Sequence, residues 1–363
     1  MEFWSAFLAE TDKSILFVLA RGFDPRMCTG LETLLQFKKS RITCLLVEFE
    51  DGKPTTNDSL EKMATQNHER LLAMCDINTI PLQPHKVNMW GSVGSGRHRV
   101  GARNAAALFD IGMLAPYTDV IVDISSMPRS IYVALIGKLM FIIDQYSATN
   151  PTSRGPNLHV MVTEDSDLDH HIRDRASDET PNYVHGFSSG MEEEATANMP
   201  KIWFPILSEN RRNQAEKIYA HINPAEVCPI LPSPSIDPRR GDSVFIALRD
   251  LLFDEWRIEP RNIIYSSEQN PFETYRQIYK AIIHYNVALK PLGGCKSILS
   301  VLSSKLLSIG ALLAAYELRK DRYSVGITHL ETQEYNLEGA AALASITNEQ
   351  LHTLWLMGSC YEL

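Results

Sequence analysis

The sequence predicts an α/β protein made of two consecutive Rossmann-like domains, each with a mostly parallel sheet and helices on both faces. Short apolar, β-rich runs alternate with helical segments, as parallel sheets with crossover helices require. This alternation occurs twice, on either side of a polar stretch at 165–200. A length of 363 residues also fits two domains better than one.

Residues 1–164 form the first expected domain. Its opening strand is "SILFVLA", and a later apolar run, "DVIVDIS", has the composition of a buried strand. The expected strands are 14–20, 41–49, 86–90, 119–125 and 158–164, and the expected helices are 27–38, 59–75, 101–114 and 127–146.

Residues 165–200 are expected to be a linker or long loop, and 201–363 a second domain that ends in a helical segment. The apolar end of the chain, 338–357, packs against the body or forms a dimer seam in this interpretation. The expected strands are 201–207, 226–232, 262–267, 286–292 and 323–330, and the expected helices are 209–222, 241–256, 271–285 and 296–319.

Composition narrows the class of protein. Hydrophobic residues make up 44% of the chain and charged residues 22%, as in soluble globular proteins. The net charge of −9 argues against bulk coating of nucleic acid, although a local basic cleft remains compatible with it. Six scattered cysteines without a CxxC pair indicate reduced thiols and a cytoplasmic protein. No signal peptide or membrane span is expected.

The first candidate loop is "ARGFDPRM", directly after the first strand. Gly22 permits a tight turn, and Arg21 and Arg26 are suited to holding an anionic group. Asp24 is suited to accepting from a ribose hydroxyl or a base. The alternative is a simple turn in which Asp-Pro begins a helix.

The second candidate is "WGSVGSGRHRVGARN", before the expected helix at 101–114. Gly94 and Gly96 lie directly before Arg97 and Arg99, so backbone N–H groups and cations together suggest a phosphate cradle. The spacing matches neither a P-loop nor a dinucleotide fingerprint. A flexible surface loop is the alternative.

The third candidate is "DISSMPRS", where a buried strand ends at a carboxylate. Asp123 needs partners because a buried charge is costly. Ser125, Ser126 and Arg129 follow at the expected start of a helix, where backbone N–H groups would face a ligand phosphate. An N-cap explains one of these serines but not the whole set.

Two candidate loops come from the second half. Asn210 and Arg211 follow the strand at 201–207, and Glu268 follows the strand at 262–267. A helix start with Pro near its first position also accounts for the sequence around Glu268.

The run "PLGGCKS" is the remaining candidate. Gly293 and Gly294 are expected at a strand-to-helix junction, with Lys296 and Ser297 at the helix N-terminus. The full P-loop spacing is missing, and a plain helix entry with an exposed lysine is the alternative.

These loops resemble those of the CRISPR-associated Rossmann fold (CARF) sensor domains, which carry ligand loops after the first and fourth strands. The resemblance covers both halves at the level of layout, through "ARGFDPRM", "DISSMPRS", "SENRRN" and "PLGGCKS". It departs from the usual Asp/Asn-x-Ser/Thr-Gly-Gly pattern of the family, because the acid lies in the first half of this chain and the glycine pair lies in the second half. The resemblance implies recognition of a nucleotide or short oligonucleotide second messenger in bacterial antiviral defence.

Two other function classes remain open. The segment "EDSDLDHHIRD" at 164–174, with Asp169 and His170, suggests a metal-dependent phosphodiesterase or nucleotide hydrolase. A solvated charged loop is the favoured explanation of this segment, so no metal, cofactor or catalytic residue is assigned. The third class is a scaffold that makes protein contacts. The leading expectation is a sensor of a nucleotide-type ligand that acts as a homodimer or with an effector protein.

Overall fold

The computed structural model describes residues 2–9, 13–37, 41–51, 58–93, 96–150, 155–165, 168, 172–188, 190–191, 193, 196–337 and 349–361. The chain divides into two compact units. Unit 1 comprises Met1–His171 and Leu337–Leu363, and unit 2 comprises Ile172–Asn336. The expected boundary segment, 165–200, is therefore divided between the units, and the C-terminal segment belongs to unit 1.

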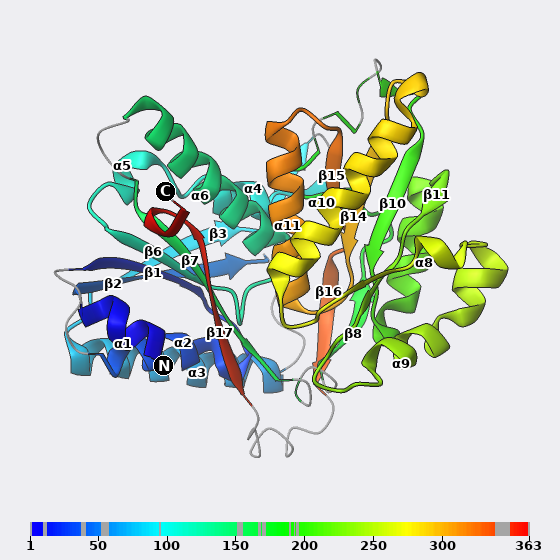
Figure 1. Cartoon of the computed structure of the whole chain (residues 1–363). Helices are drawn as coiled ribbons and strands as arrows, with labels where there is room; N and C mark the ends of the chain where they lie inside the picture. The colour runs from blue at the N-terminus through cyan, green and yellow to red at the C-terminus, as the bar shows by residue number, and fades with distance from the viewer. Residues whose placement is uncertain are drawn as a thin grey trace. The chain divides into compact units, whose positions relative to one another are not determined.

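Unit 1 is a six-stranded sheet in the order β17-β7-β6-β1-β2-β3. Its strands are β1 (Ser14–Ala20), β2 (Arg41–Glu50), β3 (Leu82–Asn88), β6 (Asp119–Asp123), β7 (Asn157–Glu164) and β17 (Gln350–Met357). All pairings are parallel except that of β17 with β7. Helices cover both faces (Figure 1). They are α1 (Glu2–Ala9), α2 (Thr29–Leu35), α3 (Asp58–Asn78), α4 (Gly101–Ala106), α5 (Ile111–Leu114) and α6 (Arg129–Thr149).

Unit 2 contains a second sheet in the order β13-β12-β10-β14-β15-β9, with β11 beside β10. Its strands are β9 (Asn182–Tyr183), β10 (Lys201–Ile206), β11 (Glu226–Val227), β12 (Ile230–Pro232), β13 (Ile264–Ser266), β14 (Lys296–Val301) and β15 (Val325–His329). Its helices are α8 (Arg212–Ile222), α9 (Arg240–Ala247), α10 (Pro271–Ala288) and α11 (Lys305–Lys320). A small sheet pairs β8 (Ile172–Ser177) with β16 (Thr332–Leu337).

The two units share one topology. Numbered along the chain within each unit, the parallel strands follow the order 3-2-1-4-5, and an antiparallel strand pairs with the fifth. This is the strand order of the Rossmann fold up to its fifth strand. The expected α/β class, with two mostly parallel sheets flanked by helices, is confirmed.

The C-terminal segment is the first correction to the expected elements. A helical segment was expected over 338–357, but Gln350–Met357 form the edge strand β17, and 338–348 lie outside the described residues. Thr353, Trp355 and their neighbours pair with the buried strand β7. The apolar character of this segment therefore comes from completing a sheet.

The second correction concerns residues 286–320. The expected strand at 286–292 is instead the end of α10 and a short 3-10 helix, and the expected helix at 296–319 begins with strand β14. All six residues of β14 are buried between β10 and β15. A short, fully buried strand lacks the alternation of polar and apolar residues that identifies a half-buried strand. Its sequence therefore cannot be distinguished from that of the apolar helix α11 that follows it.

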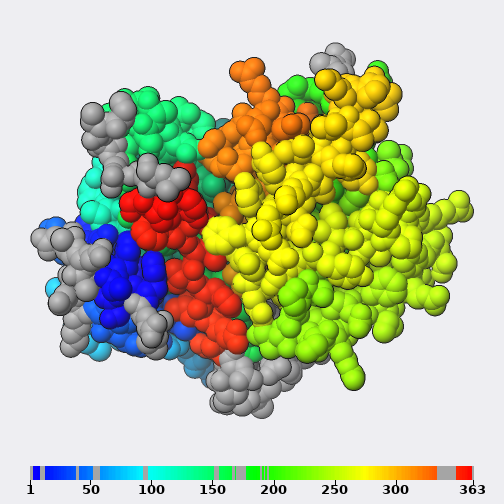
Figure 2. Space-filling model, in the orientation of Figure 1, coloured from blue at the N-terminus to red at the C-terminus, as the bar shows by residue number. Residues whose placement is uncertain are grey.

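Helix α1 and strand β17, from opposite ends of the chain, lie side by side in unit 1 (Figure 2). Trp4 Nε1 donates to Thr353 Oγ1 at 3.2 Å. Beneath them lies the fully buried ring of His159, with centroid distances of 5.4 Å to Trp4 and 5.0 Å to Trp355. The two chain ends thus enclose a titratable side chain in aromatic surroundings.

Burial lowers the pKa of His159, although its Nε2 lies only 3.4 Å from Asp119 Oδ1. Burial alone would raise the pKa of Asp119. Contact with His159 and hydrogen bonds from Thr118 at 2.6 Å and Asn157 at 2.8 Å outweigh that effect and hold the Asp119 pKa below its ordinary value. The folded state therefore favours a neutral imidazole beside an ionised carboxylate.

We expect unit 1 to lose stability as the pH falls below about 6.5, the ordinary pKa of an unfolded histidine. His159 binds its proton more weakly when folded than when unfolded, so acid favours unfolding. Burial lowers the pKa of His352 in β17 in the same way. Urea unfolding at pH 7.5 and 5.5 measures the effect, and His159→Phe should make it smaller. Stability that rose on acidification would contradict this prediction, since it would require a charged His159.

Helix α6 is long and apolar enough to cross a membrane by length and composition. However, 61% of its apolar window is buried inside the protein. The core helix of a soluble protein passes the same test, and α6 covers one face of the unit 1 sheet (Figure 1).

Candidate functional site

The carboxyl ends of the parallel strands in unit 1 lie at one edge of the sheet. The chain order runs from β1 to β2 and β3 on one side, and β6 and β7 lie on the other side. The topological switch point therefore falls between β1 and β6. The loops that follow these strands, 21–24 and 124–128, flank the position where open α/β sheets bind ligands.

The β1 loop is held by an internal ion pair. Arg26 Nε and Nη2 donate to the two carboxylate oxygens of Asp24 at 2.9 and 2.8 Å, and both residues are buried. Asp24 also accepts from the backbone N–H of Arg26 as an N-cap. Asn67 of α3 donates to the carbonyls of Gly22 and Asp24. Asp24 and Arg26, predicted as ligand-binding residues, therefore shape the loop.

The β6 loop is bonded to both neighbouring strands. Ser126 Oγ donates to the Ala20 carbonyl at 2.7 Å, and Ser125 Oγ accepts from the Thr163 N–H at 2.9 Å. Asp123 Oδ1 accepts from the Ser125 N–H at 2.9 Å. The hydroxyls predicted to face a ligand thus connect β6 to β1 and β7.

Two glycines show how tightly these loops pack. A Cβ on Gly22 would lie 3.1 Å from Ser126 Cβ, so the two loops are in contact there. A Cβ on Gly30 would lie 2.3 Å from Asp123 Oδ2, so the carboxylate fills the space that this glycine of α2 leaves. Asp123 is only 1% exposed. Its predicted role as a ligand reader does not fit this packing.

Three further polar groups lie at this edge of the sheet: the N-terminus of α6, the Ser130 hydroxyl and the Arg21 side chain. The Ncap residue of α6 is Pro128, which makes no side-chain capping hydrogen bond, and the first residue of the helix is Arg129. The Ser130 hydroxyl in the first turn is buried, 6% exposed, and has no hydrogen-bond partner within the described structure. Arg21 Nε is likewise buried without an acceptor, while its Nη2 contacts Glu61 at 3.2 Å. Sequence analysis predicted both arginines as ligand-binding residues, whereas it considered Ser130 only as a partner for Asp123.

The glycine–arginine segment forms a hairpin after β3. Strands β4 (Trp90–Val93) and β5 (Gly96–Arg99) pair antiparallel, and Gly94 lies outside the described residues. The guanidinium groups of Arg97 and Arg99 lie 4.8 and 4.4 Å from the centre of the Trp90 ring. Because β3 is parallel to β2, this hairpin begins at the same sheet edge as the β1 and β6 loops. Its described residues form a cationic pair of β-strands.

The equivalent position in unit 2 lies between β10 and β14. Its loops are joined by Ser208 Oγ, which donates to the Leu302 carbonyl at 2.5 Å. Helix α11 is capped by its own Ser304, whose Oγ accepts from the Leu307 N–H at 3.3 Å. The helix N-terminus at this edge is therefore already satisfied in part by the protein.

The two switch points carry a repeated motif that sequence analysis missed. Unit 1 has "ISSMPRSI" at 124–131 and unit 2 has "LSSKLLSI" at 302–309, each at the junction of the fourth parallel strand and its helix. The spacing Ser-Ser-x-x-x-Ser-Ile is identical in both. It could have been found by comparing the two halves once β14 was recognised as a strand.

A different polar cluster lies at the carboxyl edge of unit 2. Arg240 contacts Glu209 at 2.5 Å and Glu268 at 3.6 Å, and Ser235 donates to Glu268. The structure thus places Glu268, predicted as a site residue, beside the β10 loop. Asn210 and Arg211 belong to the same loop, as part of a 3-10 helix.

The "PLGGCKS" prediction is wrong about position. Lys296 and Ser297 begin strand β14 and pair with the start of β10, so they lie at the amino edge of the sheet. Lys296 is buried and donates to the Met191 carbonyl at 2.7 Å. Gly293 and Gly294 precede the strand with positive φ angles of 85° and 97°. These four residues are at the opposite edge from Glu268.

Metal and thiol chemistry receive no support from the described residues. They contain no cluster of three or more metal-ligating side chains. Asp169 and His170 of the 164–174 segment lie outside them. Burial raises the pKa of Cys28 to about 12 and also raises that of Cys295, which disfavours the reactive thiolate.

Comparison with known proteins gives no family. No family model and no curated protein sequence matches the chain. Among solved structures, a candidate universal stress protein from Pseudomonas aeruginosa is similar at a TM-score of 0.22 and 11% identity, over 89% of this chain and 94% of that one. A protein of unknown function from the same species gives a TM-score of 0.24 and 9% identity, over 90% and 94%. Similarities at this level support no inference about function, and the fold class rests on the sheets themselves.

Proposed function

We propose that unit 1 binds a nucleotide-type anionic ligand at the carboxyl edge of its sheet, between the loops after β1 and β6. The observation that carries this proposal is the N-terminus of α6 at the topological switch point, where the Ncap residue is Pro128 and provides no side-chain cap. A helix N-terminus offers backbone N–H groups and a partial positive charge to phosphate. The partnerless Ser130 hydroxyl in its first turn adds a further donor.

Charged side chains at the same edge support an anion. Arg129 begins α6, and Arg21 extends from the facing loop. Arg97 and Arg99, with the Trp90 ring, form the hairpin after β3, and an indole with adjacent guanidinium groups is suited to a base and its phosphate. The resemblance to CARF domains extends the range of ligands to cyclic and short oligonucleotides.

The test is a thermal-shift screen of the full chain against mono-, di-, cyclic and short oligonucleotides. A ligand at a hundredfold excess over Kd stabilises the native state by about 2.7 kcal/mol. Arg21→Ala combined with Arg129→Ala should weaken binding by about 100-fold or more, since charge-assisted hydrogen bonds contribute about 1.5–3 kcal/mol each. The matched control is Arg41→Ala, an exposed arginine at the amino end of β2.

Two outcomes would contradict the proposal. If Arg41→Ala weakened binding equally, the ligand would bind elsewhere or respond only to the net charge of the protein. Recovery of a cleaved nucleotide after incubation would identify an enzyme instead of a sensor. An intact ligand, with binding lost only in the Arg21 and Arg129 variant, supports the proposed site.

A further inference from the structure

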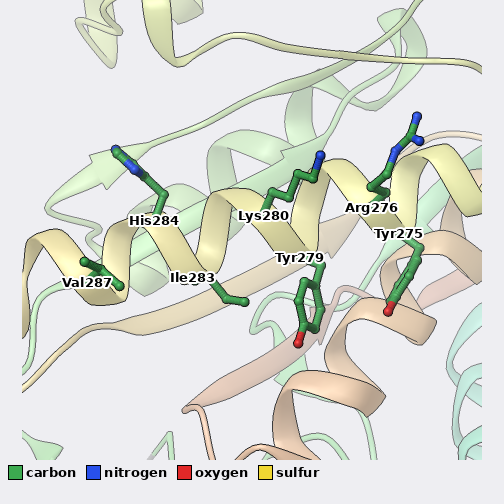
Figure 3. Close-up of a pocket in the computed structure, with 7 residues that line it drawn as sticks. All are labelled: Tyr275, Arg276, Tyr279, Lys280, Ile283, His284 and Val287. Carbon is green, nitrogen blue, oxygen red and sulfur yellow. The ribbon is translucent and has the colours of Figure 1, made fainter.

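Helix α10 of unit 2 presents an exposed face that the proposed nucleotide site does not use. An apolar row repeats every four residues along this face and consists of Tyr275, Tyr279, Ile283 and Val287. A cationic row with the same spacing consists of Arg276, Lys280 and His284. Figure 3 shows Arg276, Lys280 and His284 above the helix axis and Tyr279, Ile283 and Tyr275 below it. Because successive residues of a helix are about 100° apart, the two rows occupy adjacent sides of the helix. A groove of about 530 Å³ is lined by these seven side chains.

The cationic row is open to a partner. Arg276, Lys280 and His284 are exposed, and none forms an ion pair with a carboxylate in the part of the chain that the structure describes. The whole chain carries a net charge of −9, so this row is a local reversal of its overall charge. Figure 2 shows α10, in yellow, on the molecular surface. Charge complementarity therefore favours an acidic occupant.

The apolar row distinguishes between acidic occupants. Tyr275 and Tyr279 have ring centroids 5.7 Å apart, and Val287 is 66% exposed at the other end. The Tyr279 hydroxyl donates to Asp321, which directly follows α11, at 3.0 Å, and this places a carboxylate beside the aromatic end. That carboxylate would repel the phosphates of a nucleic acid stacked on the tyrosines. Aliphatic side chains at Ile283 and Val287 offer apolar contacts to a peptide but poor stacking to bases.

We infer that the α10 face docks an acidic amphipathic helix of a partner protein. Val287 is twelve positions after Tyr275, a length of about 18 Å along the helix. A partner helix of three to four turns covers this distance, with its apolar side chains on the apolar row and its carboxylates beside the cationic row. This is the helix-in-groove mode of recognition, anchored at every third or fourth residue.

A designed peptide tests the inference with the full chain. The probe is a fluorescein-labelled acidic helix of about 14 residues with leucine and glutamate on adjacent faces, and binding is measured by fluorescence anisotropy. Arg276→Glu with Lys280→Glu should weaken it about tenfold or more, because two attractions become repulsions. Val287→Ser should also weaken it. The control, Lys62→Glu with Arg249→Glu, makes the same change of charge at exposed cations elsewhere and should leave binding unchanged.

Several results would overturn the inference. One is equal binding of a peptide with lysine in place of every glutamate, or of a scrambled acidic peptide. Another is no saturable binding of the acidic helix at all. Tighter binding of a single-stranded oligothymidine that is lost in the Arg276 and Lys280 variant would identify a nucleic-acid surface instead. The substituted side chains are solvent-exposed, so each variant should fold normally. A melting curve of each variant checks this.

Discussion

Arg26→Ala is expected to lower the free energy of unfolding of unit 1 by about 3–5 kcal/mol, because removing one partner of a buried ion pair leaves the other charge uncompensated. The side chains of Arg26 and Asp24 are 4% and 10% exposed, and two parallel hydrogen bonds join them. Chemical denaturation followed by hydrogen exchange of peptides from unit 1 measures the loss.

Arg21→Ala is the matched control, since it removes the same charge from the same loop. The Arg21–Glu61 pair has side chains 33% and 52% exposed, and such pairs contribute about 0–1 kcal/mol. A second variant, Asp24→Asn with Arg26→Met, removes both charges and keeps the N-cap, so it should cost less than Arg26→Ala. An Arg26→Ala cost no larger than that of Arg21→Ala would contradict the structural role of the pair. The two arginines are thus expected to separate stability from ligand binding.

This division of roles could not be predicted from the sequence. The sequence shows arginines and acids close together in "ARGFDPRM" and "DISSMPRS" after buried strands, and it correctly places both loops after the strands that flank the switch point. It does not show that Asp24 and Arg26 pair with each other, or that Asp123 fills the space beside Gly30. Charges with internal partners and charges free for a ligand look the same in a sequence.

The unit 2 error has a different physical cause. "KSILSV" and "KLLSIGALLAAYELRK" are separated by only three residues, and both are rich in apolar residues because the strand is buried and the helix is buried over most of its length. Periodicity cannot separate a buried strand from a buried helix. Because the sequence predicts a helix where β14 lies, it places the loop after the fourth strand at 291–297 instead of 302–304. The second copy of the serine motif then falls inside a predicted helix and is not recognisable as a loop motif. The true strand is recognisable only through its pairing with β10 and β15.

Trp203→Ala is expected to have an effect of similar size, about 3–5 kcal/mol, but confined to unit 2. Trp203 is fully buried in β10, and its ring contacts Trp256 at 5.0 Å and Tyr219 at 6.0 Å between centroids. Its Nε1 donates to Ser300 Oγ of β14 at 2.8 Å, so the substitution leaves a cavity and an unpaired buried hydroxyl. Trp203→Phe keeps most of the packing and should cost less.

The site of the loss matters as much as its size. All residues of the hydrophobic cluster that contains Trp203 belong to unit 2. The cluster that contains Trp4, with Trp355 packed against it, belongs to unit 1. Hydrogen exchange should therefore show faster opening of β10 and β14 in Trp203→Ala while β1 and β6 keep their protection, with the reverse pattern in Arg26→Ala. Equal loss of protection in both sheets would mean that the chain unfolds as one cooperative unit. Loss confined to one sheet in each variant would mean that each Rossmann-like unit is stabilised by its own core, so that a ligand bound at the β1–β6 edge would protect unit 1 first.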